Sequence, residues 1–364
     1  MHRIPCGKNE AKKAEKRSVV FLQHGLEATS SNFVSNLPNK SLGFMLADSG
    51  FDVWMGNVRG NRYSRNHESF TETDEGYWQF SWYDMMKYDL TAMIDKVLEE
   101  TQQSQLYYVG HSQGTLIMFA KLASDKAFAQ KIKKFFALAP IVTVEHIKGL
   151  LRYLADYFSW TVRIIGAREF LPTGWQMELF KFVFCNPFGS QAPCSNLLLI
   201  ISGTVSNQLN ETRLPIFLSD LPGGTSTTNI KHWIQLVNSG QFQAYDWLDE
   251  DENIKRYGNA TPPKYDLKEI DVDMYLYWSP ADWLANEKDI KNFLLPNLKK
   301  EVSLKYDIRT NSPQTRVIVN EKLNDFNHMD FIWGERAAKE IYKPIIEIIK
   351  TNEMSKKTKK IYYV

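Results

Sequence analysis

Residues Leu106–Gly114 read LYYVGHSQG, and this stretch decides the fold that we predict. Four residues of strand-like composition run into GHSQG at 110–114, and a helix-like segment follows from Thr115 to Ala123. A strand, a G-x-S-x-G turn and a helix form the setting of a nucleophile elbow, a sharp turn that exposes a serine hydroxyl. A plain glycine-rich turn is the alternative. We predict that Ser112 is a nucleophile if the chain also supplies a base, an acid and an oxyanion hole.

The composition of the chain excludes several classes of protein. Its 364 residues suffice for one large domain with an insertion or for two domains. The net charge of +2 and the lack of a broad basic field argue against a nucleic-acid partner. No run of about 18 apolar residues exists, so we expect no transmembrane helix. Aromatic residues make up 13% of the chain, which suits either a large core or a surface that meets apolar ligands.

The N-terminus, the sequons and the cysteines bear on the cellular compartment. The first residues are polar and lysine-rich, so we expect no signal peptide in this chain. N-x-S/T sequons at Asn39, Asn210 and Asn259 point instead to the secretory route, although such triplets also arise by chance. Cys185 and Cys194 flank a turn-rich loop that a disulfide could close, and three buried thiols are the alternative.

Short apolar runs alternate with helical patterns over much of the chain. Beside Leu106–Gly114, strands are predicted at Ser18–Leu22, Phe51–Met55, Lys134–Ala139, Met274–Trp278 and Arg316–Val319. Helices are predicted at Ser41–Ser49, Trp82–Glu100, Glu287–Leu294 and Phe331–Lys350, and residues 1–16 read as a charged lead-in. This alternation is typical of an α/β fold with a mostly parallel sheet.

The alternation stops between residues 143 and 266. This segment is rich in aromatic residues and reads as several helices without alternating strands. Because the sheet pattern resumes afterwards, we predict a helical cap inserted into an α/β core made of 1–142 and 267–364, with a separate domain as the alternative. Sites in parallel sheets lie at the carboxyl ends of the strands, so the insertion would cover the site.

Chain order selects the base and the acid. A serine hydroxyl needs a histidine base that a carboxylate orients, and in the α/β-hydrolase arrangement the order is Ser, Asp or Glu, then His. Of seven histidines, only His328 follows the late strand, in a loop before the last helix. Asp282 comes four residues after MYLYW and is the predicted acid. A helix-capping histidine and a turn aspartate are the respective alternatives.

Backbone groups complete the predicted site. In this arrangement the oxyanion hole uses one N–H from the residue after the nucleophile and one from an early strand-to-helix loop. These are Gln113 and, in the turn QHGL, Leu26. An ordinary turn is the alternative for QHGL. No metal-ligand spacing, phosphate-binding loop or dinucleotide fingerprint occurs, so we predict no metal and no cofactor.

Four longer stretches resemble the acid lipase family, which includes the gastric and lysosomal acid lipases. They are FLQHGLEATSSNFVSNLPNKSLGFMLADSGFDVWMGNVRGNRYSRNH (Phe21–His67), YVGHSQGT (Tyr108–Thr115), HWIQLVNSGQFQAYDW (His232–Trp247) and FNHMDFIWG (Phe326–Gly334). The resemblance runs from about Arg3 to about residue 350. It implies an α/β-hydrolase fold with a helical cap and a lid, and hydrolysis of triacylglycerols and cholesteryl esters after secretion or in lysosomes.

Carried over by motif, the resemblance assigns the same site. Ser112 matches the family nucleophile, Asp282 the acid, His328 the base, and Leu26 and Gln113 the oxyanion donors. The resemblance also implies a cap disulfide between Cys185 and Cys194, and sequons at the positions of Asn39 and Asn210.

The chain departs from the family pattern in three places. It opens at His-Arg-Ile-Pro, inside the usual mature domain, so the signal peptide and the first strands are expected to be missing. The 46 residues between Asp282 and His328 exceed the usual spacing, with the extra length expected in 297–322. Asp282 also sits in SPAD rather than in a glycine-rich turn.

We therefore expect a serine hydrolase of neutral lipid esters that works at a lipid–water interface, without cofactor. A small-ester carboxylesterase with the same triad is the nearest alternative, and an inactive lipid-binding homologue is a further one. The sequence does not fix the preferred lipid or the oligomeric state.

Overall fold

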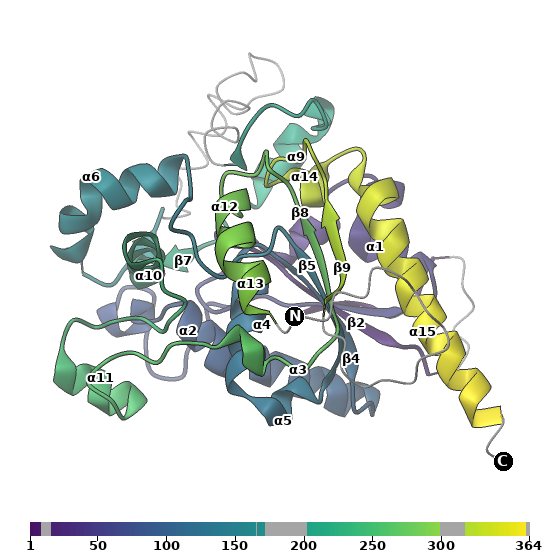
Figure 1. Ribbon diagram of the computed structural model, residues 1–364, viewed down its shortest axis with the longest axis horizontal. Coiled ribbons are helices and arrows are strands. Elements are labelled where there is room, and N and C mark those ends of the chain that lie inside the picture. Colours follow the sequence, from purple (N-terminus) through teal and green to yellow (C-terminus); the bar gives the residue numbers. More distant parts are fainter. Residues whose placement is uncertain (9–15, 165, 172–201, 299–316, 362–364) are drawn as a thin grey trace.

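A seven-stranded sheet runs through the middle of the structure, a computed structural model that describes residues 1–8, 16–164, 166–171, 202–298 and 317–361 (Figure 1). The strand order is β1-β3-β2-β4-β5-β8-β9. The strands are β1 (His2–Ile4), β2 (Val19–Gln23), β3 (Asp52–Met55), β4 (Leu106–His111), β5 (Ile132–Leu138), β8 (Met274–Trp278) and β9 (Val317–Lys322). Only β1 runs antiparallel to its neighbour among these strands, so the predicted mostly parallel sheet is confirmed.

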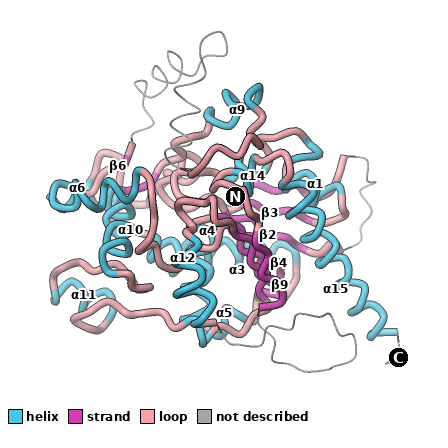
Figure 2. The backbone as a smooth tube through the Cα atoms, turned by 45° about the horizontal axis from the view of Figure 1, so that its top comes forward, coloured by secondary structure: helices cyan, strands magenta, loops and turns pink. Residues whose placement is uncertain are grey.

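Helices cover both faces of the sheet. They are α1 (Leu42–Asp48), α2 (Trp82–Asp84), α3 (Leu90–Thr101), α4 (Gln113–Ser124), α5 (Lys126–Ala129), α12 (Glu287–Asp289), α13 (Leu295–Asn297), α14 (Asp330–Trp333) and α15 (Lys343–Ile361). In Figure 1, α1 and α15 lie together on one side of the sheet, and α3, α4 and α5 lie on the other. Figure 2 shows the strands enclosed between these helices. No helix in the described ranges is long and apolar enough to cross a membrane.

The core lies between the sheet and its helices. Every residue of β4 is buried, which explains why its sequence is a nearly continuous apolar run rather than an alternating one. Across this strand, Phe135 packs edge-to-face on Tyr108 and Phe119, with ring centroids 5.6 and 4.9 Å apart. Truncating such a buried ring to alanine typically costs about 3–5 kcal/mol.

The predicted helix at Trp82–Glu100 is present as one helical run. A π-helical turn, Met85–Asp89, joins α2 to α3. The apolar residues at helical spacing along this run are buried: Met85, Met86, Leu90, Met93, Ile94 and Val97. Its packing against the sheet therefore accounts for the helical spacing seen in the sequence.

The reading of residues 1–16 as a charged lead-in was wrong at its start. His2–Ile4 form β1, an edge strand that pairs antiparallel with β3. Arg3 binds the buried carboxylate of Asp52 through two N–H groups, at 2.9 and 2.8 Å, and stacks over Trp54. This short strand closes an edge of the sheet that we expected to lack its first strands.

The last predicted helix, Phe331–Lys350, is interrupted. Gly334 has an extended backbone (ψ 137°), so α14 ends at Trp333. A Cβ at Gly334 would lie 2.5 Å from the carbonyl oxygen of Asp330, so no larger residue fits at the C-terminus of α14. The helix resumes with a π-helical turn at Ala338–Tyr342 and continues as α15.

The long segment between β5 and β8 is inserted between two strands that are neighbours in the sheet. Its elements are α6 (Leu150–Ile164), β6 (Glu169–Phe170), α9 (Leu214–Ser219), β7 (Thr225–Ser226), α10 (Thr227–Ser239) and α11 (Glu250–Tyr257). The expectation of helices alone was wrong in one respect, because β6 and β7 form a small antiparallel sheet. In Figure 1, α6, α10 and α11 lie beside the core. Cys185 and Cys194 fall outside the described residues.

Candidate active site

The carboxyl ends of β2 and β4 bring two predicted site loops together. These strands are adjacent and parallel, with Gln23 opposite Gly110. The chain leaves β2 toward β3 on one side and reaches β4 on the other, so a topological switch point lies between them. Loops at such a point diverge and leave room for a ligand. The loops after β8 and β9, which carry Asp282 and His328, start at the same edge because these strands are parallel to β4.

Ser112 occupies the expected turn between β4 and α4. Its backbone has φ 55° and ψ −123°, a strained conformation for a residue with a side chain. The two flanking glycines allow the turn. A Cβ at Gly110 would lie 2.8 Å from the Gly114 carbonyl carbon, and one at Gly114 would lie 2.4 Å from the Gln23 oxygen. Strand, turn and helix therefore have the geometry of a nucleophile elbow.

Asp282 and His328 meet although they are 46 residues apart. Nδ1 of His328 lies 2.8 Å from Oδ2 and 3.0 Å from Oδ1 of Asp282. Both side chains are buried, the aspartate completely. With the Nδ1 proton donated to the carboxylate, the neutral ring has its lone pair on Nε2, where it can accept a proton. Within the described residues Nε2 makes no hydrogen bond, to Ser112 or to any other side chain.

The turn that holds Asp282 combines the two roles weighed from the sequence. Oδ1 accepts the backbone N–H groups of Leu284 and Ala285 at 2.8 and 3.0 Å, as a turn aspartate does. The same carboxylate also binds His328. The SPAD turn thus fixes the carboxylate through its own backbone, without the glycine-rich turn that the resemblance implied.

The loop that carries His328 is fixed on both sides of the histidine. Oδ2 of Asp330 accepts the N–H of Asn327 at 2.7 Å, and Oδ1 of Asn327 accepts the N–H groups of Met329 and Asp330. The N–H of His328 binds the carbonyl oxygen of Ser202 at 3.0 Å. The ring of His328 does not cap α14, which begins without a side-chain cap. The helix-capping alternative for this histidine is therefore wrong.

His111 links the nucleophile turn to the base loop. Its Nε2 donates to the carbonyl oxygen of His328 at 2.9 Å, and the two ring centroids lie 4.8 Å apart. Burial, with a smaller contribution from His328, lowers the pKa of His111 well below its usual value. His111 is therefore neutral. Its hydrogen bond ties the loop of His328 to the turn that carries Ser112.

The loop that carries Leu26 and the start of α4, which carries Gln113, both adjoin Ser112. A Cβ at Gly25 would stand 2.9 Å from Cβ and 3.3 Å from Oγ of Ser112, so the backbone before Leu26 packs directly on the serine. Gln113 is the first residue of α4, where a backbone N–H has no acceptor within the helix. The positive end of the helix dipole adds to the attraction for an anion at this point.

Three comparisons with known proteins agree with this geometry. The chain matches a family profile described as alpha/beta hydrolase fold over residues 18–304. It is 48% identical over 363 residues to lipase lipl-1 of Caenorhabditis elegans, which covers 98% of this chain and 86% of that protein. It is 38% identical over 350 residues to the gastric triacylglycerol lipase of Bos taurus, with 96% and 84% covered. This chain belongs to the acid lipase family.

The lipase is thus a carboxylic ester hydrolase with the α/β-hydrolase fold. Among solved structures, it resembles a soluble variant of monoglyceride lipase from Saccharomyces cerevisiae, with a TM-score of 0.53 and 10% identity over 96% of this chain and 90% of that one. At this identity the likeness concerns the fold alone.

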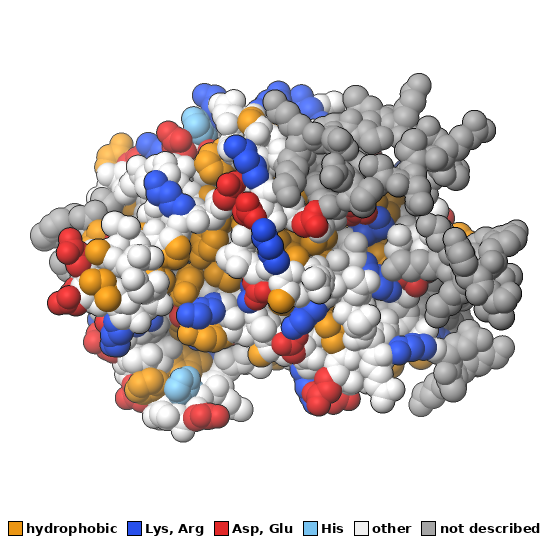
Figure 3. Space-filling model, turned by 60° about the horizontal axis from the view of Figure 1, so that its bottom comes forward, with side chains coloured by type: hydrophobic (Ala, Val, Ile, Leu, Met, Phe, Trp, Pro, Cys, Tyr) orange, Lys and Arg blue, Asp and Glu red, His pale blue; other side chains and the backbone are white. Residues whose placement is uncertain are grey.

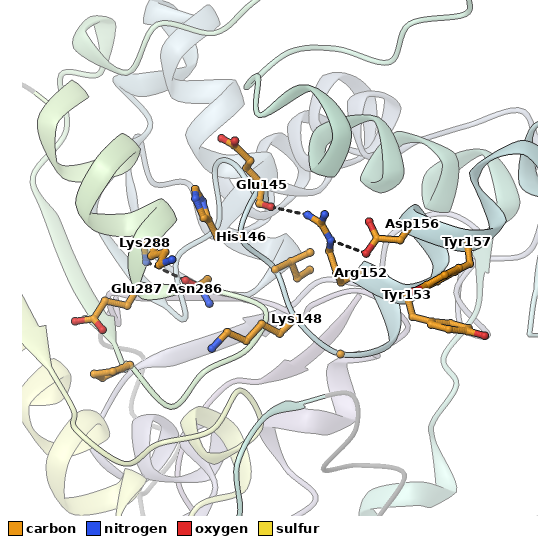
Figure 4. A pocket seen from close by; sticks show the side chains of 13 residues that line it. Glu145, His146, Lys148, Arg152, Tyr153, Asp156, Tyr157, Asn286, Glu287 and Lys288 are labelled. Carbon is orange, nitrogen blue, oxygen red and sulfur yellow. Dashed lines mark hydrogen bonds and ion pairs between the residues drawn. The ribbon is translucent and has the colours of Figure 1, made fainter.

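A pocket of about 590 Å³ opens between the start of α6 and α12 (Figure 4). It is lined by Glu145, His146, Ile147, Lys148, Gly149, Arg152, Tyr153, Asp156, Tyr157, Pro280, Asn286, Glu287 and Lys288. Ser112, Asp282 and His328 do not line it, and its charges are of both signs. Beneath it His146 pairs with Asp289, Nδ1 to Oδ1 at 3.0 Å. Its lining mixes these charged side chains with the apolar surfaces of Ile147, Tyr153, Tyr157 and Pro280.

Glu27, directly after Leu26, was not among the residues predicted for the site. Its backbone has a positive φ of 53°, and its Oε1 is buried. Burial raises the pKa of Glu27 to about 8, against the smaller opposing effect of the Gly224 N–H that it accepts. An acidic residue next to the QHGL motif was the available signal, but its hydrogen-bond partner is a glycine 197 positions away.

The remaining predicted sites are on the surface or outside the described ranges. Asn39, in a 3-10 helix (Pro38–Lys40), and Asn259, in a bend, are exposed, whereas Asn210, in a loop, is half-buried. Among the described residues, Cys6 is a free cysteine. These residues contain no group of three or more His, Cys, Asp or Glu side chains placed to hold a metal ion.

Proposed function

We propose that this lipase hydrolyses neutral lipid esters, triacylglycerols or cholesteryl esters, through an acyl-enzyme on Ser112. The observation that carries the proposal is the buried His328–Asp282 pair at the sheet edge that also holds the nucleophile elbow. The substrate class rests on the relatives, one of which is a gastric triacylglycerol lipase.

In the first half of the proposed reaction, Nε2 of His328 takes the proton of the Ser112 hydroxyl as Oγ attacks the ester carbonyl carbon. The carbonyl oxygen becomes an oxyanion, which accepts hydrogen bonds from the N–H groups of Leu26 and Gln113. When the intermediate collapses, His328 returns the proton to the leaving alcohol, and the acyl group stays on Ser112.

In the second half, His328 takes a proton from water, and the resulting hydroxide attacks the acyl carbon. Collapse releases the fatty acid, and Ser112 regains its proton from His328. Asp282 stabilises the imidazolium in both halves and keeps the Nδ1–H pointed toward itself. Each proton taken is returned, so the residues leave the cycle unchanged.

We propose that residues 143–266 form a cap over the core made of 1–142 and 267–364. The side chain of Gln113 supports this role, because its Oε1 accepts hydrogen bonds from Asn229 and Trp233 of α10. On α6, Tyr153 and Tyr157 are 52% and 72% exposed, with ring centroids 4.8 Å apart and ring planes tilted by 40°. Exposed tyrosines suit a lipid–water interface, since the ring is apolar and the hydroxyl polar.

The surface supports a lipid rather than a nucleic acid as partner. On the face shown in Figure 3, acidic and basic side chains are interspersed and hydrophobic ones lie between them. A nucleic-acid site would require a basic stripe.

We further propose that the lipase acts in lysosomes or after secretion, with glycans at Asn39, Asn210 and Asn259 and a disulfide between Cys185 and Cys194. The exposure of Asn39 and Asn259 supports this proposal. Digestion of the protein from its native source with an N-glycosidase should reduce its apparent mass. An unchanged mass would contradict the glycans.

Substrate chain length tests the proposed function. The purified lipase should hydrolyse emulsions of a long-chain triacylglycerol or cholesteryl ester, and Ser112→Ala should not. Cleavage of soluble short-chain esters alone would instead indicate a small-ester carboxylesterase with the same triad.

A further inference from the structure

The cap stretch Gly223–Trp233 touches both loops that carry the proposed oxyanion donors. It begins with two glycines whose backbone packs on backbone of the core. A Cβ at Gly223 would lie 2.6 Å from the carbonyl oxygen of Ala28, and one at Gly224 would lie 2.5 Å from that of Gly60. Only glycine allows two backbone segments to approach this closely. The stretch therefore packs directly on the QHGLEA loop at Ala28.

Glu27 forms the contact with the first donor loop. Its carbonyl oxygen accepts the N–H of Gly223 at 2.7 Å, and its Oε2 accepts the N–H of Gly224 at 3.0 Å. Both hydrogen bonds therefore hold the residue that directly follows Leu26. The positive φ of Glu27 needs such support, because it is an uncommon conformation for a residue with a side chain.

Asn229 and Trp233 form the contact with the second donor. Oε1 of Gln113 accepts Nδ2 of Asn229 at 2.9 Å and Nε1 of Trp233 at 2.8 Å. All three side chains are buried. Asn229 is itself fixed, since its Oδ1 accepts the N–H of Trp82 at 2.8 Å. The side chain of the second donor residue is thus held from α10.

We propose that the stretch Gly223–Trp233 positions both oxyanion donors, with Glu27 and Asn229 as the positioning residues. The proposal rests on the proposed function, in which Leu26 and Gln113 bind the oxyanion. A preorganised oxyanion hole stabilises the transition state because its donors do not have to reorient during the reaction. One segment that holds both donors sets the distance between them.

The carboxyl group of Glu27 fits this role better than a general structural role. Its Oε1 is buried and has no hydrogen-bond partner among the described residues, which is unfavourable for folding. An apolar side chain would avoid that loss but could not accept the N–H of Gly224. A glutamate at this position therefore provides a hydrogen-bond acceptor next to Leu26 at a cost in folding stability.

The test compares truncations of these residues with a matched control. Asn253, in α11, has the same hydrogen-bond pattern as Asn229: its Oδ1 accepts one backbone N–H and its Nδ2 donates twice, to Asp246 and Ala260. It is also buried in the cap. Asn253→Ala thus removes the same interactions far from the oxyanion donors. Turnover of a soluble ester and melting temperature are measured for each variant.

We expect Glu27→Ala and Asn229→Ala to lower kcat by about 10-fold or more, with KM changed less than about 3-fold, because misplaced donors weaken only the transition state. Trp233→Phe, which keeps a buried ring, should act in the same direction. Glu27→Gln retains an acceptor for the N–H of Gly224 and should recover most of the activity. Asn253→Ala should keep the wild-type kcat even if its melting temperature falls.

Wild-type kcat in folded Asn229→Ala, Trp233→Phe and Glu27→Ala would overturn the proposal and leave the proposed function intact. Equal kcat losses in Asn229→Ala and Asn253→Ala would also overturn it, because they would reflect general damage to the cap. An inactive wild type would contradict the proposed function itself.

Discussion

Nδ1 of His328 lies 2.8 Å from Oδ2 of Asp282, and both groups are buried. If this carboxylate sets the tautomer of the base, Asp282→Asn should lower kcat by about 10⁴-fold, because an amide can donate to Nδ1 and leaves the proton on Nε2. KM should change little. Steady-state kinetics on a soluble ester measure both constants.

A second His–Asp pair, with a buried aspartate and a half-buried histidine, provides the control. His146 and Asp289 form the same Nδ1-to-Oδ1 contact, at 3.0 Å, outside the site. Asp289→Asn should keep kcat within about 3-fold of the wild-type value. This substitution can change stability, but a change in stability alone does not alter the turnover of the molecules that remain folded. Similar losses in the two variants would contradict a special role for Asp282.

Gly25 should tolerate no side chain. In Gly25→Ala the added Cβ would meet the Ser112 side chain at 2.9 Å from Cβ and 3.3 Å from Oγ. The clash would push the Leu26 N–H away from the developing oxyanion, so we expect kcat to fall about 100-fold. Circular dichroism should show a folded protein. A variant with wild-type kcat would mean that the QHGL turn is an ordinary turn.

Glu27 should make folding stability depend on pH. Burial raises the pKa of this carboxyl to about 8, with Glu169 raising it further and Arg65 opposing it, whereas the unfolded value is near the ordinary 4.5. Between these values the folded state binds one more proton than the unfolded state, so stability decreases as pH rises from about 4.5 to about 8. Glu27→Gln removes this contribution.

Melting curves test this dependence. The melting temperature of Glu27→Gln should exceed that of the wild type increasingly from pH 4.5 to pH 8. Glu68→Gln, at an exposed loop position, should follow the wild-type curve. A difference between Glu27→Gln and wild type that does not change with pH would show that Glu27 is not protonated in the folded lipase.

The ion pair of β1 should contribute to stability but not to catalysis. Arg3→Ala leaves the carboxylate of Asp52, which is 4% exposed, without its two charge-assisted hydrogen bonds. Because the Arg3 side chain is 43% exposed, solvent screens the pair, and we expect a loss of only about 1 kcal/mol in urea unfolding. An unchanged unfolding midpoint, or a fall in kcat, would contradict this assignment.

The elements that the sequence predicted are those with strong local patterns. The buried strand before Ser112 is a continuous apolar run, and the elbow has glycines where the backbone crosses closely. Chain order then selected Asp282 and His328, which the fold brings into contact. These features could be predicted because local sequence determines them.

Other features depend on distant partners and had no local signal. β1 has three residues and exists because β3 offers an edge and Asp52 a counter-ion. β6 has two residues, which are paired only through β7. The carboxyl group of Glu27 accepts a hydrogen bond from Gly224, 197 positions away. In each case tertiary packing overrides the local propensity.

Covalent labelling tests whether Ser112 is an activated nucleophile. A fluorophosphonate probe reacts with a serine that a base activates, and peptide mass spectrometry locates the adduct. We expect one adduct, on the peptide that contains GHSQG, in the wild type and none in Ser112→Ala. An unlabelled wild type, or equal labelling of Ser112→Ala, would contradict the role of Ser112 as the nucleophile.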